Sequence, residues 1–272
     1  MVFGKDLLLK LPLAAIKKNK KIMSADEYVI SIIRKYYLNP ISISDSRIKN
    51  MTDFLSSWAG VYLNKLKLSG STAKDTLIKG NTDIDIFVSL KSSNTSTLKY
   101  LYNDLFNSLN QELQIRRQNV SIGVVWNGLK FDLIPAKQHK TNSNYHSLYV
   151  RKGDTWTQAN IDLHINKVTN SGRLNEIRAT KIWRQNHNLE FPSFYLELIV
   201  IEALRNKGKN QLSSNFWTVL QYLRDSFRNK RVVDPSNTNN IISGSLTLAE
   251  KNKIAQQASS SLNQQYWRNI IW

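Results

Sequence analysis

The sequence predicts an α+β fold with two lobes, a mixed-sheet lobe over residues 1–150 and a helical lobe over residues 151–272. Segments rich in β-branched residues, and the turn Asn127-Gly128, lie in the first half and favour a sheet. From about residue 158, apolar residues recur at three- and four-residue spacing, which is typical of helices. With 272 residues, 41% of them hydrophobic and 21% charged, the chain can bury a sizeable core.

Two helices are expected before the first strand. Ser24 followed by Glu27 forms a capping-box pattern, which begins a helix that Asn39-Pro40 should end. A stripe of apolar residues at helical spacing predicts a second, longer helix that lies along a core, and a short strand at 66–68 follows it. The stripe consists of Ile48, Met51, Leu55, Trp58 and Tyr62.

The sheet continues through a strand, a helix and a hairpin. A strand is expected over 82–90 and a helix over about 95–113. Asn127-Gly128 joins strands expected at 120–126 and 129–134, because both turn residues tolerate positive φ. The remaining helices are expected near 158–169, 172–187, 193–206, 214–229 and 247–258.

Composition restricts the chemistry that is available. The chain has no Cys, which excludes disulfides, thiolate metal sites and Cys nucleophiles and is consistent with a reducing compartment. The apolar stretch from Leu7 to Ile16 is interrupted by Lys10 and Pro12, so we interpret it as mature sequence rather than a signal peptide. Since no run approaches the roughly 20 apolar residues of a membrane span, we expect a cytoplasmic protein with no membrane partner.

The segment from Gly70 to Asp85 and the later Asp132 carry the strongest indication of chemistry. Gly70 permits close backbone approach, and Ser71 stands where a strand ends and a short helix begins, a place where amide groups and a hydroxyl can bind a phosphate. Asp83 and Asp85 are two apart on a strand, so both side chains leave one face. Asp132 adds a third carboxylate if its strand lies beside theirs. Carboxylates gathered in this way repel unless cations neutralise them, which favours Mg²⁺.

Taken singly, each part of this pattern is weak. A Gly-Ser dipeptide is usually a loop, an Asp-x-Asp pair on a strand is more often a solvated face, and a single Asp such as Asp132 usually serves as a cap or an ion-pair residue. The combination at this spacing reverses that balance and favours a metal and phosphate site.

Together these residues resemble the nucleotidyltransferase superfamily that includes DNA polymerase beta, whose motif is Gly-Ser, then Gly-x-Ser/Thr-Asp-x-Asp, with a later Asp. Within it, the chain resembles the bacterial CD-NTases, cyclic-oligonucleotide synthases related to cyclic GMP-AMP synthase and oligoadenylate synthase. The resemblance covers about 45–258. Three further segments match the CD-NTases: Lys181-Ile-Trp183-Arg184, Phe191-Pro-Ser193-Phe194-Tyr-Leu-Glu197, and Val233-Asp234-Pro235 with Asn239-Asn240.

The resemblance implies a bilobed polymerase beta-like fold, with a catalytic lobe over 1–150 and a helical lobe that completes the nucleotide cleft. It implies that Asp83, Asp85 and Asp132 are catalytic and bind two Mg²⁺ ions, or Mn²⁺, and that Gly70 and Ser71 bind the nucleotide. From the helical lobe, Lys181 and Ser193 would contact the triphosphate and Phe194 would stack on a base, where the family commonly has Tyr. Asn166 is a further candidate for reading a base edge. The alternatives are that Lys181 is a solvated helix residue, Phe194 belongs to the core, and Asn166 is a cap or exposed.

The excess of positive charge needs a separate explanation. Lys and Arg number 38 against 20 Asp and Glu, giving +18, and such a field attracts polyanions. We expect an RNA or DNA activator on a basic surface, although a solvated basic face explains the charge equally well. Any such surface would lack the Cys/His zinc insertion of cyclic GMP-AMP synthase. The candidate contacts are Lys17, Lys18, Lys20 and Lys21, and a helical stripe of Arg224, Arg228 and Arg231.

Three functions therefore compete. The preferred one is a synthase that condenses two or more NTPs into a cyclic oligonucleotide second messenger, with release of pyrophosphate, in antiphage (CBASS) defence; a downstream effector would sense the product rather than this chain. The second is a template-independent RNA nucleotidyltransferase of the CCA-adding kind. The third is an inactive nucleic-acid-binding module, which the three retained Asp residues argue against.

Overall fold

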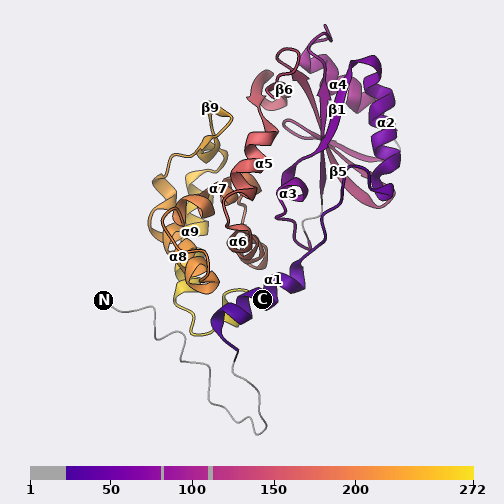
Figure 1. Cartoon of the computed structure of the whole chain (residues 1–272). Coiled ribbons are helices and arrows are strands. Elements are labelled where there is room, and N and C mark those ends of the chain that lie inside the picture. Colours follow the sequence, from indigo (N-terminus) through magenta and orange to yellow (C-terminus); the bar gives the residue numbers. More distant parts are fainter. Residues whose placement is uncertain (1–22, 81–82, 110–112) are drawn as a thin grey trace. The chain divides into compact units, whose positions relative to one another are not determined.

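The structure is a computed structural model that describes residues 23–80, 83–109 and 113–272 (Figure 1). The chain forms two compact units. The first, called here the sheet unit, consists of residues 39–167 and 234–240. The second, the helical unit, consists of the described residues 23–38, 168–233 and 241–272. A mixed sheet in one unit and helices in the other confirm the predicted α+β class.

The sheet unit is built on a mixed seven-stranded sheet. Strands β1 and β2 are followed in the order by β5, β4 and β3, while β6 pairs with the far end of β5 and β7 pairs with β6. Only β2 and β5 run parallel among these pairs. The bounds are β1 (Leu63–Leu68), β2 (Ile84–Leu90), β3 (Gln114–Arg117), β4 (Ile122–Trp126), β5 (Leu129–Gln138), β6 (His146–Val150) and β7 (Thr155–Ala159).

The hairpin that carries Asp132 forms as predicted. Asn127 and Gly128 have φ values of 50° and 75°, the left-handed conformation that a two-residue type I′ turn requires. The turn sets the register of β4 against β5, with Trp126 opposite Leu129. A sequence preference of two residues therefore determines which residue of β4 faces Asp132.

Helices cover the sheet according to the alternation of its side chains. Ile84, Ile86 and Val88 on β2 enter the main core together with Met51 and Leu55 of α2 (Lys49–Ala59) and Leu101 and Leu105 of α4 (Leu98–Ser108). Phe87, on the other face, packs with Ala136, Leu148 and Ile161, the last from α5 (Ile161–Thr169). Asp85 alternates onto this second face, away from α2 and α4.

The helical unit contains five α-helices in its described part: α1 (Ala25–Tyr36), α6 (Leu174–Asn186), α7 (Ser193–Ala203), α8 (Leu212–Asp225) and α9 (Leu248–Leu262). The capping box expected at Ser24 is present: its hydroxyl accepts from the Glu27 amide and the Glu27 carboxylate accepts from the Ser24 amide. Trp183 of α6 and Phe216 of α8 are fully buried in this unit. A short hairpin, β8 (Val233–Asp234) and β9 (Asn237–Ile241), precedes α9.

The compact units do not follow the expected boundary after residue 150. Residues 155–159, partly expected as helix, form β7 and pair with β6, so the chain stays in the sheet unit until α5 ends its contact with the sheet. Residues 23–38 group with the helical unit and residues 234–240 with the sheet unit. Tertiary contacts decide these assignments, such as the packing of α1 on α6 and α8 and the hydrogen bond between Asp234 and His164, and local periodicity does not record them. None of the helices in the described ranges has the length and apolar composition that crossing a lipid bilayer requires.

Candidate active site

Four residues form one transverse row across the sheet. Arg116 of β3 pairs with Gly123 of β4, Gly123 pairs with Asp132 of β5, and Asp132 pairs with Asp85 of β2. Directly paired residues project on the same face, and neighbouring strands lie roughly 4.8 Å apart. β5 thus lies beside β2, and the row places the Asp85 and Asp132 carboxylates next to each other on the face opposite α2 and α4.

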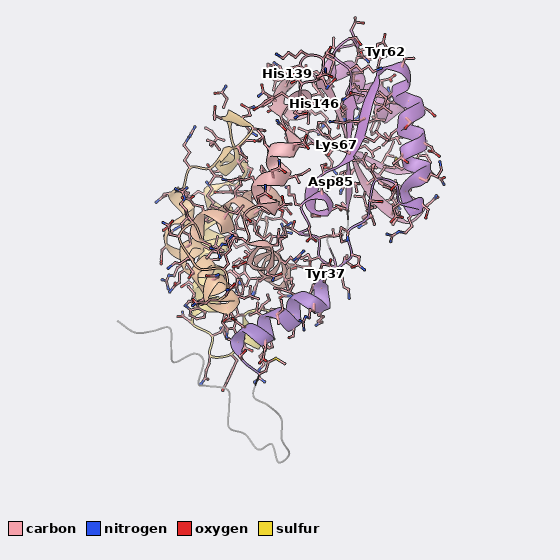
Figure 2. All side chains as sticks on the ribbon, viewed as in Figure 1. Tyr37, Tyr62, Lys67, Asp85, His139 and His146 are labelled. Carbon is pink, nitrogen blue, oxygen red and sulfur yellow. The ribbon has the colours of Figure 1, made fainter. Side chains whose placement is uncertain are left out.

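Asp83 directly precedes β2 and adds to the negative charge. Burial raises the pKa of Asp132 above its ordinary value, and the charge of Asp83 raises it further, against the opposing effects of Gln118 and Arg116. The influence of Asp83 on Asp132 shows that the two carboxylates are close enough to repel. Figure 2 labels Asp85 on the ribbon of the sheet unit.

Gly70 is fitted against Asp85. A Cβ atom at Gly70 would lie 1.8 Å from Oδ2 and 2.4 Å from Cγ of Asp85, and the φ of Gly70 is 56°, a value that disfavours other residues. The amide of the preceding Ser69 donates to the Asp85 carbonyl at 2.9 Å. The Gly70-Ser71 turn, which begins the short helix α3 (Gly70–Ala73), therefore packs directly on the carboxylate row.

Gln118 is a site residue that the sequence patterns do not indicate. Its Nε2 donates to Asp132 Oδ1 at 2.7 Å, and its Oε1 accepts from the Ser121 hydroxyl at 2.8 Å. Gln118 lies between β3 and β4, outside any motif, and a single Gln in a loop carries no recognisable signal. The one hint in the sequence is Gly123, which interrupts an otherwise β-branched strand and so marks a close approach.

The donor set suits a hard divalent cation, because carboxylate oxygens are the ligands that Mg²⁺ prefers. A cation would also relieve the repulsion that raises the pKa of Asp132. As they stand, no three His, Cys, Asp or Glu side chains in the described ranges converge closely enough to hold a metal ion. The residues therefore fit Mg²⁺ by chemistry and placement, and the ions stay a prediction.

Lys181 is not a solvated helix residue. It and Glu197 are both 0% exposed, and the Lys181 Nζ donates to Glu197 Oε1 at 2.7 Å, joining α6 to α7. A buried charge needs such a partner, because desolvating a single unpaired ion costs several kcal/mol. The alternative of a solvated position is wrong, and the triphosphate contact of Lys181 stays a prediction.

Ser193 and Phe194 stand in the first turn of α7, both half-buried. Arg184 Nη1 donates to the Ser193 hydroxyl at 3.1 Å and to the Phe191 carbonyl at 2.6 Å. Burial lowers the pKa of Arg184, although the guanidinium keeps its charge. Arg184 is thus a second cation beside a predicted triphosphate contact. Asn166 is exposed on α5, so it does not belong to the core.

The predicted stripe of Arg224, Arg228 and Arg231 is wrong. Helix α8 ends at Asp225, Arg228 lies in a separate 3-10 turn (Phe227–Asn229), and Arg231 follows it. The helix stops there because Phe227 is fully buried against the ring of Phe191, 5.1 Å between centroids. Arg224 pairs with the adjacent Asp225, Nε to Oδ1 at 2.6 Å. The other basic candidates, Lys17, Lys18, Lys20 and Lys21, lie outside the described residues.

The late Asp-Pro segment has a structural contact in the sheet unit. Asp234 is buried, with its Oδ1 2.6 Å from Nε2 of His164 on α5, and it accepts from the amide of Ser236 at 2.8 Å. Burial would raise the pKa of Asp234, but the His164 and Ser236 hydrogen bonds outweigh it and lower that pKa. These bonds attach residues 234–240 to the sheet unit.

A mixed sheet with paired carboxylates on β2 and β5 and a glycine turn against them, accompanied by a helical unit, is the polymerase beta-like nucleotidyltransferase fold. No protein-family model matches the chain. The chain is 22% identical over 198 residues to the CBASS oligonucleotide cyclase CdnC of Escherichia coli (strain KTE188), an alignment that covers 65% of this chain and 63% of CdnC. It therefore spans less than two thirds of the length of the curated relatives it matches.

Solved structures confirm the resemblance to the bacterial CD-NTases at the level of the fold. E. coli MS115-1 CdnC with ATP has a TM-score of 0.68 at 19% identity and covers 86% of this chain and 89% of its own. The Bradyrhizobium diazoefficiens CD-NTase CdnG in complex with GTP has a TM-score of 0.69 at 12% identity, covering 87% and 91%. The Elizabethkingia meningoseptica CdnE cyclic dinucleotide synthase has a TM-score of 0.65 at 14% identity, covering 90% and 100%. This chain has the CD-NTase fold.

Proposed function

We propose that this protein is a metal-dependent nucleotidyltransferase that condenses NTPs into a cyclic oligonucleotide second messenger in CBASS antiphage defence. The observation that carries the proposal is the register of Asp85 against Asp132, with Gly70 packed on Asp85. Similarity to E. coli CBASS oligonucleotide cyclases supports the cyclic product over the extension of an RNA chain. The retained carboxylates argue against an inactive module.

Each transfer would form a bond between a 3′-oxygen and an α-phosphorus and break the bond from that phosphorus to pyrophosphate. Asp83, Asp85 and Asp132 would hold two Mg²⁺ ions, which supply charge stabilisation and a more acidic hydroxyl when bound. Asp132, which lies directly beside Asp85 across the parallel strands, would also accept the hydroxyl proton. A second transfer within the bound linear intermediate would close the ring.

The helical unit would supply phosphate and base contacts. Ser193, at the first turn of the 11-residue helix α7, would donate to a phosphate oxygen, and Arg184 beside it would provide charge. Phe194 would stack on a base. Lys181 would contact the triphosphate, for which its ammonium would have to be shared between Glu197 and a phosphate oxygen.

Activation by RNA or DNA remains part of the proposal on the basis of net charge alone, +18. The arginine residues at 224, 228 and 231 do not form the stripe that would have strengthened it. A downstream effector would respond to the released product.

The test is to incubate purified protein with radiolabelled NTPs and Mg²⁺, with and without RNA, and to separate the products. We expect a small product that resists phosphatase, since a ring has no terminal phosphate. A lengthened RNA would instead establish the RNA-extending alternative, and no turnover under any condition would establish the inactive module. Asp85→Asn serves as the inactive control, and Asp53→Asn, an exposed carboxylate paired with Lys49 in the same unit, as the matched active control.

A further inference from the structure

We propose that Gln118 is a positioning residue that holds the Asp132 carboxylate in the orientation needed for nucleotidyl transfer, and that Gly123 is a glycine to make room for it. The inference rests on the proposed function for its catalytic consequence. The hydrogen bond from Gln118 to Asp132, called here the clamp, lies within the sheet unit and can be tested separately from catalysis.

The orientation of the Gln118 amide is determined by its partners. The Ser121 hydroxyl donates to the carbonyl end, Oε1, at 2.8 Å, which leaves the NH₂ end for Asp132 Oδ1 at 2.7 Å. An ionised carboxylate cannot donate a hydrogen bond. The reverse orientation of the amide would therefore place two acceptors, Gln118 Oε1 and Asp132 Oδ1, against each other. Gln118 therefore occupies one carboxylate oxygen, Oδ1, and we assign the other, Oδ2, to the metal or the reacting hydroxyl.

The backbone around Gln118 is fixed as well. The Gln118 amide donates to the Ser121 carbonyl at 3.0 Å, closing the turn between β3 and β4. Tyr102 of α4 is fully buried, and its hydroxyl shares its one proton between the Gln118 carbonyl, at 2.8 Å, and the Ser121 carbonyl, at 3.0 Å. The turn is thus attached to the main core, and a side chain on a fixed turn loses less entropy in holding its partner.

Gly123 creates the space that the clamp occupies. In the transverse row it stands between Arg116 and Asp132, where any other residue would project a side chain on the same face. A Cβ atom there would lie 2.9 Å from Gln118 Nε2 and 2.6 Å from Arg116 Nε. Both atoms would have to shift, and the Gln118 atom that would shift is the Nε2 that donates to Asp132. The glycine explains how a loop side chain reaches a carboxylate in the middle of a sheet.

The effect on catalysis should appear in turnover rather than in nucleotide affinity. Gln118 contacts the carboxylate and no predicted phosphate contact, so its removal leaves the triphosphate contacts in place. Loss of a residue that orients a metal ligand typically lowers activity by about 10- to 100-fold. We expect Gln118→Ala to lower kcat by about that factor while KM for NTP changes by less than about twofold.

The chain offers a matched control in the next residue. Asn119 has the same side-chain chemistry in the same turn, but its Oδ1 accepts from the Lys152 amide at 3.0 Å and makes no contact with the carboxylate row. Asn119→Ala should keep kcat within about threefold of the wild type, as expected for a surface substitution. Gly123→Ala is the second variant: it keeps Gln118, suits a strand, and should lower kcat by displacing the amide.

The experiment measures kcat, KM and thermal stability of these variants, and the ¹⁵N side-chain amide signal of Gln118 in the unliganded protein. A drop in kcat for Gln118→Ala and Gly123→Ala but not Asn119→Ala, with the amide signal shifted in Asp132→Ala, supports the proposal. Equal kcat in Gln118→Ala and Asn119→Ala overturns it while leaving the proposed function intact. If the wild type makes no product, the amide signal decides alone: insensitivity to Asp132→Ala overturns the clamp, and a shift supports it.

Discussion

Charge is arranged in opposite ways in two regions of the molecule. One region is the group of three aspartates in the sheet unit, Asp83, Asp85 and Asp132, and the other is the Lys181–Glu197 pair of the helical unit. Asp83 and Asp132 have the same sign, are close enough for one to raise the pKa of the other, and remain partly accessible. Lys181 and Glu197 have opposite signs, 2.7 Å apart, and are fully buried. The first arrangement brings like charges together, and Gln118 and Arg116 offset the resulting rise in the pKa of Asp132 only in part, whereas the second pairs opposite charges directly.

This difference teaches which charged residues to assign to chemistry. Uncompensated charge in a folded protein is unfavourable, so its presence points to a ligand that completes it. Compensated buried charge is fully explained by the fold. On this criterion Asp83 and Asp132 remain the strongest candidates for catalysis, with Asp85 joined to Asp132 by strand register rather than by charge. Lys181 becomes primarily a residue that joins α6 and α7.

The largest expected effect is loss of turnover when one of the three aspartates of the sheet unit loses its charge. Asp83→Asn or Asp85→Asn should lower kcat by about 10³-fold or more, because the amide keeps the shape but removes a metal ligand worth several kcal/mol. For Asp83→Asn, thermal stability should stay equal to or above that of the wild type, since its repulsion of Asp132 is relieved. Turnover assays and thermal melts check both; near-normal kcat in either variant would contradict the metal assignment.

The compensated pair should respond in stability. Lys181→Met removes the buried ammonium that donates to Glu197 Oε1 and should cost up to about 3–5 kcal/mol of unfolding free energy. The double variant Lys181→Met, Glu197→Met should recover most of that loss, because both charges are then absent. Urea titrations measure the two values. A double variant that is stable but binds nucleotide weakly would support a direct triphosphate contact for Lys181. Pairing within the fold would then not exclude a charged residue from a functional role.

The sheet unit also contains a buried polar residue whose hydrogen bonds are satisfied, His146. It shows whether the contrast between the two regions comes from charge or from the unit in which a residue lies. His146 is buried, with Nε2 2.7 Å from the Ser89 hydroxyl and Nδ1 3.1 Å from the Asn144 carbonyl, and burial lowers its pKa to about 4. Between about pH 6.5 and 4 the unfolded chain binds the proton and the folded chain does not, so stability falls as pH falls.

We expect the contribution of His146 to lower the unfolding free energy by about 2 kcal/mol from pH 7 to pH 5. His146→Gln, whose side chain does not titrate, should flatten the pH dependence in urea titrations. His139→Gln is the control, because His139 is exposed; Figure 2 labels both histidines. An equal pH slope in wild type and His146→Gln would refute the assignment.

Ser193→Ala tests the smaller contribution of the helical unit to nucleotide binding. Removal of one hydroxyl donor costs about 1 kcal/mol, or roughly a fivefold rise in the Kd for ATP. Calorimetry with Mg²⁺–ATP measures it, and Ser214→Ala, an exposed serine in the first turn of α8, is the control. An unchanged Kd would leave Ser193 as a partner of Arg184 alone.

The smallest effect is expected for the exposed arginines. Arg224→Glu with Arg228→Glu should change stability by less than about 0.5 kcal/mol, because the Arg224 pair with Asp225 is exposed. Affinity for single-stranded RNA should fall less than after reversal of Lys18, Lys20 and Lys21, since Asp225 already offsets Arg224. Binding titrations at several salt concentrations compare the two sets. A larger loss from the arginine reversal would reverse that ranking.

The sequence by itself determined what depends on a few neighbouring residues. The capping box of Ser24 and Glu27 and the turn at Asn127-Gly128 were predicted from local preferences and formed accordingly. The predicted strand over 82–90 also formed and holds Asp85, but it begins at Ile84, so Asp83 directly precedes it. Local preferences act over one turn of helix or two residues of strand, so they are present in the sequence itself.

Only the tertiary structure decided which distant residues meet. The parallel pairing of β2 with β5 placed Asp85 beside Asp132, and the same assembly brought Gly70 onto Asp85, Gln118 onto Asp132 and Lys181 onto Glu197. It also ended α8 at Asp225, where burial of Phe227 outweighed the continued helical spacing of the arginines. Strand register and core packing depend on the whole chain at once, so no window of the sequence contains them.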